Sequence, residues 1–261
     1  MKLLLICPFP PEFNACREIL SLRDFKPVSG CRSARGSAGK VDVLAVESGP
    51  AKARAAAATV AGSLSYTPDL VVDTGSCAGT EPGAFVGQLI LCRDCYEYDI
   101  GGSGFPTRSI PEMKLPSAIS VLPADDRETL LREAGETGSS ESFQVRAGNQ
   151  ACGELLIQSR AMREALYTLF QASGANWESA GVFVGALKNR LPPLSIRIVT
   201  DLGNEQALND FRANIKQKAR ELYRYIRVLA EYGWFGHLLE CWQRLDPVTV
   251  DRLPQRVLPS T

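Results

Sequence analysis

Histidine is almost missing from this 261-residue sequence, in which His237 is the only one. A Ser-His-Asp triad or a histidine-rich metal site would have to use that single side chain. A zinc site built from cysteines is also unsupported, because the pair Cys92-x-x-Cys95 has no second pair to complete it. The sequence therefore predicts chemistry that runs mainly on carboxylates, with no metal and no organic cofactor.

Long apolar runs and an excess of either charge are also missing. No segment approaches the roughly 20 apolar residues that a membrane-spanning helix needs. Lys and Arg together number 29, as do Asp and Glu, and no basic stripe is longer than a few residues. We therefore expect neither a nucleic acid nor a membrane as a partner. The opening "MKLLLICPFPPEF" has one Lys and a short apolar run broken by prolines, so we expect a cytoplasmic protein.

The cysteines and glycines exclude two further classes. Eight cysteines in a chain of this length do not make a disulfide scaffold, and most of them sit in apolar surroundings where a reduced thiol packs as a small hydrophobe. The pattern G-x-G-x-x-G is not satisfied, which argues against a dinucleotide-binding oxidoreductase.

What the chain does have is an alternation of short apolar runs with helical patterns. The runs "KLLLIC", "KVDVLAVESG", "PDLVVDTGSCAG", "VGQLILCRDCYEYDI", "FQVRAG" and "SIRIVT" predict buried strands. A strong apolar stripe predicts a helix over 205–232, and 156–172 is also expected to be helical, whereas 101–142 is hard to interpret beyond one helix. Such an order predicts an α/β domain over 1–232, with a mainly parallel sheet covered on both faces. The composition changes at 233–261, which we interpret as a helical and proline-rich C-terminal extension.

Polar side chains follow several of the predicted strands. Glu12 comes just after the first strand, Ser76 lies in the glycine-bounded turn after the third, and Asp201 ends the last. The carboxyl ends of parallel strands meet at one edge of a sheet, where α/β proteins place their ligands, so we expect these residues to converge. Glu178, ahead of a small-residue helix, is a fourth candidate. Several acids around one cleft suit bond cleavage in which one acid protonates a leaving group and another activates water.

The same segments carry a family resemblance. In order, "MKLLLICPFPPEF", "ESGPAKARAAAAT", "PDLVVDTGSCAGT", "VGQLILCRDCYEYDI", "NWESAG" and "SIRIVTDLGNEQALNDF" resemble the motifs of the purine nucleoside phosphorylase/uridine phosphorylase superfamily. Within it, the chain is most similar to the methylthioadenosine/S-adenosylhomocysteine nucleosidases. The resemblance implies a single-domain, three-layer α/β/α sandwich around a twisted, mostly parallel mixed sheet. It also implies hydrolysis of the N-glycosidic bond of a purine nucleoside, and a homodimer or higher homo-oligomer.

The resemblance assigns roles to individual residues. Glu12 would activate the attacking water, and Asp201 would protonate the leaving base, for which it must stay protonated near neutral pH. Glu178 would accept hydrogen bonds from the ribose hydroxyls. The backbone of Ser76 and Cys77 would line the pocket.

The base pocket departs from the family pattern. Cys152 or its neighbour Ala151 stands where the nucleosidases have a phenylalanine that stacks on adenine. Trp177 could supply an aromatic face from the other side. The predicted substrate-binding set is completed by Gly79 in the turn after the third strand. The substrate therefore stays open between a methylthioadenosine-like and a futalosine-like purine nucleoside.

Other interpretations stay open. Glu12 could be only a favourable acid in the first turn of a helix, Asp201 a cap between strand and helix, and Glu178 a solvated helix charge. Phosphorylases of the superfamily bind phosphate with an arginine at the position of Asp73, where a carboxylate would repel phosphate. Another arginine (Arg32, Arg35 or Arg54) could replace it, so a phosphorylase remains an alternative, as does a nucleoside-binding homologue without catalysis.

Overall fold

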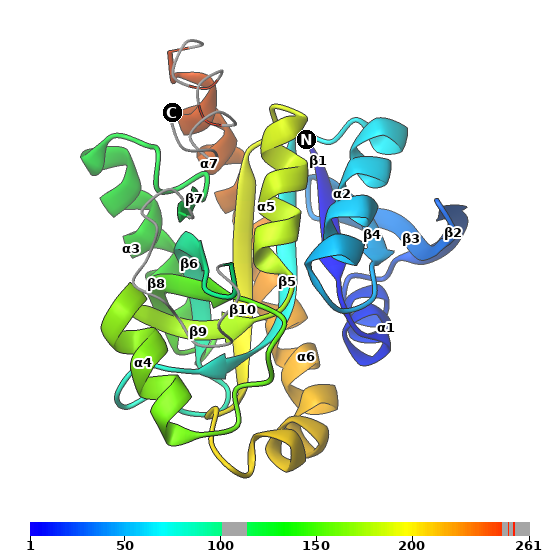
Figure 1. The fold of residues 1–261 in the computed structure, drawn as a ribbon. Helices are drawn as coiled ribbons and strands as arrows, with labels where there is room; N and C mark the ends of the chain where they lie inside the picture. The colour runs from blue at the N-terminus through cyan, green and yellow to red at the C-terminus, as the bar shows by residue number, and fades with distance from the viewer. Residues whose placement is uncertain (101–113, 247–249, 251–252, 254–261) are drawn as a thin grey trace.

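The computed structural model describes residues 1–100, 114–246, 250 and 253. Its strands are β1 Lys2–Cys7, β2 Arg23–Val28, β3 Cys31–Ala38, β4 Val41–Glu47, β5 Leu70–Gly79, β6 Leu89–Glu97, β7 Lys114–Pro116, β8 Val145–Cys152, β9 Ala172–Asn176 and β10 Pro193–Asp201. Its helices are α1 Pro10–Ile19, α2 Lys52–Tyr66, α3 Ala124–Ser140, α4 Arg160–Phe170, α5 Ser179–Lys188, α6 Ala207–Glu231 and α7 Trp234–Gln243. Strands and helices alternate along most of the chain (Figure 1).

The strands form one mixed sheet that closes partly on itself. Its order is β10-β6-β8-β9-β5-β1-β4-β3-β2, β7 pairs with β6, and β10 also pairs with β5. That last pairing joins β5, β9, β8, β6 and β10 into a ring. Strands β4, β1, β5 and β10 are mutually parallel, so the carboxyl ends of β1, β5 and β10 meet at one edge, as expected.

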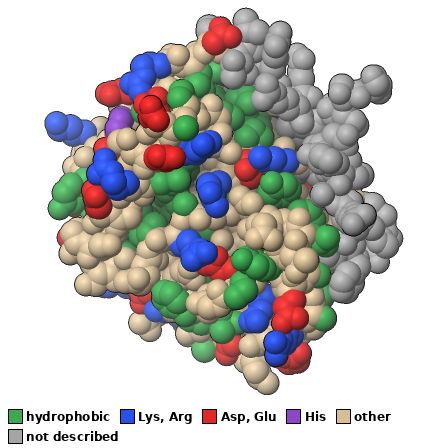
Figure 2. All heavy atoms as spheres, turned by 90° about the vertical axis from the view of Figure 1, so that its left-hand side faces the viewer, with side chains coloured by type: hydrophobic (Ala, Val, Ile, Leu, Met, Phe, Trp, Pro, Cys, Tyr) green, Lys and Arg blue, Asp and Glu red, His purple; other side chains and the backbone are tan. Residues whose placement is uncertain are grey.

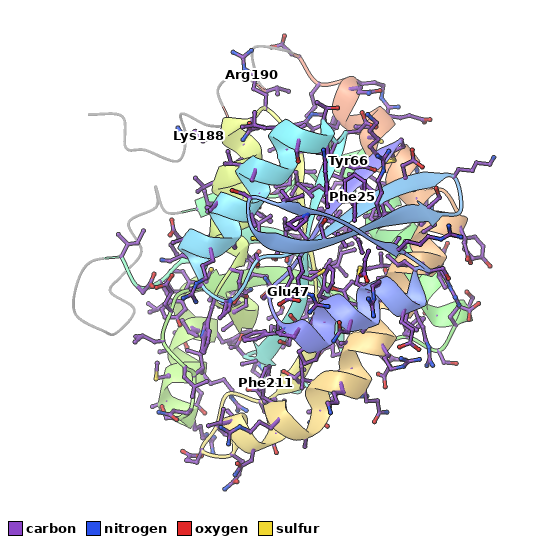
Figure 3. All side chains as sticks on the ribbon, turned by 90° about the vertical axis from the view of Figure 1, so that its right-hand side faces the viewer. Phe25, Glu47, Tyr66, Lys188, Arg190 and Phe211 are labelled. Carbon is purple, nitrogen blue, oxygen red and sulfur yellow. The ribbon has the colours of Figure 1, made fainter. Side chains whose placement is uncertain are left out.

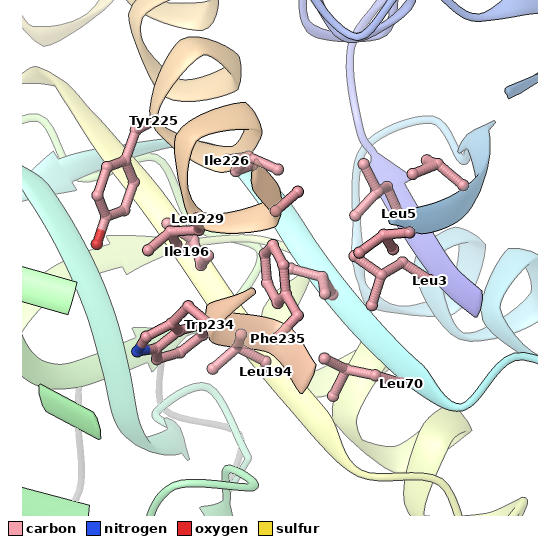
Figure 4. Close-up of a cluster of buried hydrophobic side chains, with 14 of the residues drawn as sticks. Leu3, Leu5, Leu70, Leu194, Ile196, Tyr225, Ile226, Leu229, Trp234 and Phe235 are labelled. Carbon is pink, nitrogen blue, oxygen red and sulfur yellow. The ribbon is translucent and has the colours of Figure 1, made fainter. Parts of the chain in front are cut away.

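Helices cover both faces of the sheet, because its central strands are apolar on both sides. On one face, α1, α3, α6 and α7 share a core with alternate residues of β1, β5 and β10. On the other, α2 and α5 pack over the intervening residues. Figure 4 shows part of the first core, a cluster that includes Leu3 and Leu5 of β1, Ile226 of α6 and Phe235 of α7. The expected α/β fold with a twisted mixed sheet is confirmed.

All six predicted strands are present, and the helix expected over 205–232 is α6 within two residues at its start and one at its end. The helix expected over 156–172 is shorter, because Ser159 caps α4 by accepting a hydrogen bond from the Met162 amide. Four strands were missed, namely β2, β3, β7 and β9. The sequence of β9, "ASGAN", consists of residues that are depleted in strands or lack a strand preference, and pairing with β5 and β8 holds it in place.

Helix α7, at the start of the expected C-terminal extension, packs into the core of the domain. Trp234, Phe235 and Leu238 of α7 are buried in the same core as α6 and β10. Part of the hard-to-interpret segment, 101–113, lies outside the described residues, as does most of 247–261. None of the described helices is both long and apolar enough to cross a bilayer. Figure 2 shows a face on which acidic and basic side chains are interspersed.

Candidate active site

A cavity of about 330 Å³ lies at the carboxyl edge of β5 and β10, a volume within the range of small-molecule sites. Five residues singled out from the sequence line it: Ser76, Cys77, Trp177, Glu178 and Asp201. Three of them come from strands β5 and β10, while Trp177 and Glu178 follow β9. The fold thus brings side chains more than a hundred positions apart in the sequence to one hollow.

Glu12 lies directly behind Ser76 and is completely buried. Its Oε1 accepts hydrogen bonds from the Ser76 amide at 2.7 Å and from the Ser76 hydroxyl at 2.8 Å. Its Oε2 accepts from the Phe9 amide at the start of α1, at 2.9 Å. Glu12 is therefore an acid in the first turn of α1, as one of the two interpretations of the sequence expected. It is also hydrogen-bonded to Ser76, which lines the cavity. Burial raises the pKa of Glu12, and the charge of Arg197 and these hydrogen bonds oppose that rise.

A glycine permits this close approach of α1 to β5. Gly75 has φ +135°, and a Cβ there would lie 3.0 Å from both Glu12 Oε1 and Arg197 Nη1. A side chain at this position would crowd both the acid and the guanidinium and would strain the backbone at this φ, so the local backbone of β5 is part of the site.

Asp201 is nearly buried and lines the cavity at the end of β10. Its carboxylate accepts hydrogen bonds from the Gly203 amide at 3.0 Å and from the Thr200 hydroxyl at 3.1 Å. These contacts are local, and α6 begins after Gln206 without a side-chain cap, so Asp201 does not cap that helix. Burial raises the pKa of Asp201 to about 6, against the effect of the two hydrogen bonds. It therefore holds its proton closer to neutral pH than an ordinary aspartate.

Glu178 is buried as well, which removes the alternative of a solvated helix charge. Its Oε1 accepts from the Ala51 amide at 3.2 Å, and its Oε2 accepts from Arg197 Nη1 at 3.1 Å. Burial raises the pKa of Glu178 to about 7, with Arg197 lowering it and the charges of Glu12 and Asp73 raising it. Arg197 was not singled out from the sequence, although an arginine inside an apolar core strand is a signal that a buried acid faces it.

Two residues expected to bind substrate are not among the described residues that line the cavity. A Cβ on Gly79 would contact Ala84, Val199 and Leu202, so this glycine serves the packing of β5 against β10 and its surroundings. The Cys152 thiol points at the start of α5, where it accepts a hydrogen bond from the Ala180 amide at 3.3 Å.

Aromatic side chains that the sequence analysis did not single out supply much of the apolar wall. Phe9, Tyr98 and Phe211 line the cavity together with Trp177. The rings of Phe9 and Phe211 meet edge to face with centroids 5.6 Å apart, and Phe211 lies at the start of α6 beside α1 (Figure 3). Their meeting depends on the packing of α1 against α6, which no local pattern reveals.

The three arginines considered as phosphate ligands are engaged elsewhere. Arg32 pairs with Glu47 at 2.8 Å, Arg35 stacks on the ring of Tyr66, and Arg54 donates to the Pro50 carbonyl. Glu47 and Tyr66, the partners of Arg32 and Arg35, lie at two separate places in Figure 3. None of the three arginines is among the described cavity residues.

The expected repulsion of phosphate by Asp73 needs correction. Asp73 is completely buried, forms an ion pair with Arg197, and is not among the described residues that line the cavity. Its charge is compensated, so it does not face an incoming anion as an isolated carboxylate. The described lining carries Glu178, Asp201 and one exposed cation, Arg212. In the described residues, no group of three or more His, Cys, Asp or Glu side chains could hold a metal ion.

Taken together, fold and site define an α/β protein with a small-molecule cavity bounded by buried carboxyl groups at the strand ends. The chain belongs to the Phosphorylase superfamily, whose family model matches residues 2–231.

Two individual relatives are similar to this chain over most of its length. A 5′-methylthioadenosine/S-adenosylhomocysteine nucleosidase of Tolumonas auensis is 24% identical over 222 residues, which cover 84% of this chain and 94% of the relative. The enzyme of the same name from Anoxybacillus flavithermus is also 24% identical, over 84% of this chain and 93% of its own.

Among solved structures, futalosine hydrolase of Helicobacter pylori superposes with a TM-score of 0.76 at 18% identity, over 89% of this chain and 98% of that one. A mutant methylthioadenosine nucleosidase of the same organism, with 5′-methylthioadenosine in its active site, gives a TM-score of 0.76 at 17% identity over 88% and 98%. At these identities the superpositions show that the fold is shared.

Proposed function

We propose that this protein is a nucleosidase that hydrolyses the N-glycosidic bond of a purine nucleoside. The observation that carries the proposal is that Glu178 and Asp201 line one cavity, with Glu12 hydrogen-bonded to the cavity residue Ser76 and with the pKa of Asp201 raised to about 6. The relatives named above, nucleosidases and a futalosine hydrolase, support the same reaction class.

In this proposal each acid has a part in the reaction. Protonated Asp201 donates its proton to the purine, so that the base leaves as a neutral molecule. Ionised Glu178 accepts hydrogen bonds from the ribose hydroxyls and stabilises the positive charge that develops on the sugar. The Ser76 hydroxyl donates to Glu12 and can accept from a water in the cavity, which connects that water to the acid. The water's oxygen bonds to the anomeric carbon while its proton passes towards Glu12.

Water suits this cavity better than phosphate as the acceptor of the sugar. A phosphate dianion needs cations to compensate its charge, and the described lining offers two acids against the single exposed Arg212. Arg197 is already hydrogen-bonded to Asp73 and Glu178. Hydrolysis is therefore favoured over phosphorolysis by the charge balance of the site.

The test is release of free purine from a panel of nucleosides, measured by chromatography with and without phosphate. The panel contains 5′-methylthioadenosine, S-adenosylhomocysteine, futalosine, adenosine and inosine, and Asp201→Asn serves as the inactive control. Base release without phosphate supports the proposal. Strict dependence on phosphate would make the protein a phosphorylase. Binding in a thermal-shift screen without release would make it a nucleoside-binding homologue.

Two finer expectations belong to the same proposal. We predict a homodimer, to be checked by light scattering of the purified chain at micromolar concentration. A monomeric mass at that concentration would contradict it. We also keep the prediction of a cytoplasmic location, to be checked by fractionation of the source cells.

A further inference from the structure

Asp73, which lies outside the described cavity wall, is the most heavily hydrogen-bonded acid around the site. Its Oδ2 accepts from the hydroxyls of Ser179 and Ser195, both at 2.6 Å, and from Arg197 Nε at 3.0 Å. Its Oδ1 accepts from Arg197 Nη2. All of these groups are completely buried. A carboxylate with two hydroxyl donors and a two-pronged guanidinium partner is held in one orientation.

Arg197 links this acid to the cavity. Two of its nitrogens are used by Asp73, and the third, Nη1, donates to Glu178 Oε2 and to the Ser76 carbonyl, each at 3.1 Å. One buried cation therefore serves two acids directly, and Glu178 receives only a single hydrogen bond from it. Because Asp73 compensates part of the charge of Arg197, ionised Glu178 keeps part of its negative charge beside the cavity.

A second connection runs through the backbone. Ser179, whose hydroxyl donates to Asp73, follows Glu178 and is the first residue of α5. The Asn176 side-chain oxygen accepts from the amides of both Glu178 and Ser179, at 3.0 and 2.9 Å. The chain on each side of Glu178 is thus tied down, once to Asn176 and once to Asp73.

We propose that Asp73 is a positioning residue that controls the charge of Glu178 by occupying Arg197, and so keeps a net negative charge next to the developing sugar cation. The inference rests on the proposed nucleosidase function for its catalytic meaning. The control over Glu178 itself needs only the contacts described here. Without Asp73, the full charge of Arg197 would fall on Glu178 and cancel it.

The groups that act on Glu178 come from several elements. Arg197 of β10 lowers its pKa, whereas Glu12 of α1 and Asp73 of β5 raise it, in addition to the effect of burial. The Ala51 amide ahead of α2 lowers it. Cys77 of β5 also faces this cluster, but burial raises the pKa of its thiol so far that it stays uncharged. Asp73 is thus the acid whose removal changes the charge next to Arg197 while leaving the cavity wall intact.

The direct test is the titration of the Glu178 carboxyl, followed by NMR of protein labelled with ¹³C at glutamate carboxyls, with Glu178→Gln to assign the signal. In Asp73→Asn the midpoint should move down by about one pH unit or more, the size expected when a nearby like charge is removed. Asp73→Ala should move it in the same direction. The matched control is Ser195→Ala, which removes one hydrogen bond from Asp73 but leaves its charge, and should leave the midpoint within about 0.3 units.

Each outcome of these titrations either supports or refutes the proposed role of Asp73. An unchanged Glu178 midpoint in folded Asp73→Asn and Asp73→Ala would refute the proposal, as would an equal shift in Ser195→Ala. If neither Asp73 variant folds, Asp73 has a structural role instead and the proposal is overturned. Because the titration needs no turnover, it reads out even if the protein releases no base, so its failure is distinguishable from failure of the nucleosidase assignment.

Kinetic measurements give a second test, with a result that a purely structural role of Asp73 would not produce. With an active substrate, Asp73→Asn should move the acid limb of kcat/KM to lower pH, following Glu178. At the same time kcat should fall by about tenfold or more, because the negative charge beside the sugar is now cancelled, while the Kd of the nucleoside changes less than about threefold. A uniform loss at every pH with no movement of the limb would contradict the inference.

Discussion

The pH dependence of kcat/KM is the sharpest consequence of the site's electrostatics. The proposed mechanism needs Glu178 ionised and Asp201 protonated in the free enzyme. Burial places the pKa of Glu178 at about 7 and that of Asp201 at about 6. Activity should rise with pH as Glu178 loses its proton and fall with pH as Asp201 loses its own. The required form is therefore a minority at every pH, and the profile should be a narrow bell centred near pH 6.5.

The magnitude follows from the two values. At pH 6.5 each group is about half a unit on the unfavourable side of its pKa, so roughly a quarter of each is in the required form. About one molecule in twenty then carries both, and two units away on either side kcat/KM should be about twentyfold lower. Ionisation of Glu12, whose pKa burial also raises, can only steepen the acid side.

The assay is initial-rate base release at low substrate, from pH 4.5 to 8.5 at constant ionic strength. Glu178→Gln is the matched variant, since any activity that it retains should lose the contribution of Glu178 to the acid limb and keep the decline above about pH 6. A flat kcat/KM between pH 5.5 and 8 would refute the reasoning, because neither carboxyl would then titrate as the burial of the site requires.

Four further predictions address three single residues. Asp201→Asn should lower turnover by about 10²- to 10⁴-fold yet leave nucleoside binding within about tenfold by calorimetry; an active variant would remove the proton-donor role. The pKa of Asp201 is raised on folding, so its protonation stabilises the fold below about pH 4, and that stability is lost as pH rises through 6. Relative to Asp201→Asn, the wild type's free energy of unfolding, measured with urea, should therefore fall by on the order of 3 kcal/mol as the pH rises through this range. If the free energies of the two proteins change with pH in parallel, the raised pKa of Asp201 is contradicted. Arg197→Met should cost about 3–5 kcal/mol in the same assay at pH 7, since it leaves Asp73 and Glu178 buried without their cation; a loss under 1 kcal/mol would argue against that pairing. Trp177→Ala should weaken nucleoside binding by about 1 kcal/mol, roughly fivefold, and unchanged affinity would mean that the indole does not stack on the ligand.

Much of the fold was predictable because it depends on local patterns of apolar residues in the sequence. Continuous apolar runs mark β1, β5 and β10, which are buried on both faces, and an apolar stripe marks α6. The parallel arrangement of those strands follows from the intervening helices, and it alone places the residues after them at one edge. Glu12, Ser76 and Asp201 could therefore be brought together without coordinates.

The tertiary structure decided the rest, because it depends on contacts between distant segments. Glu178 reaches the cavity at the end of β9, a strand with little intrinsic preference that exists through its pairing with β5 and β8. Arg197 and Asp73 are 124 positions apart, and no spacing in the sequence reveals that they share a buried ion pair. The sequence by itself therefore determined which strand ends carry acids. Only the closed packing of the sheet decided which charges those acids meet, since burial and neighbouring charge set their protonation.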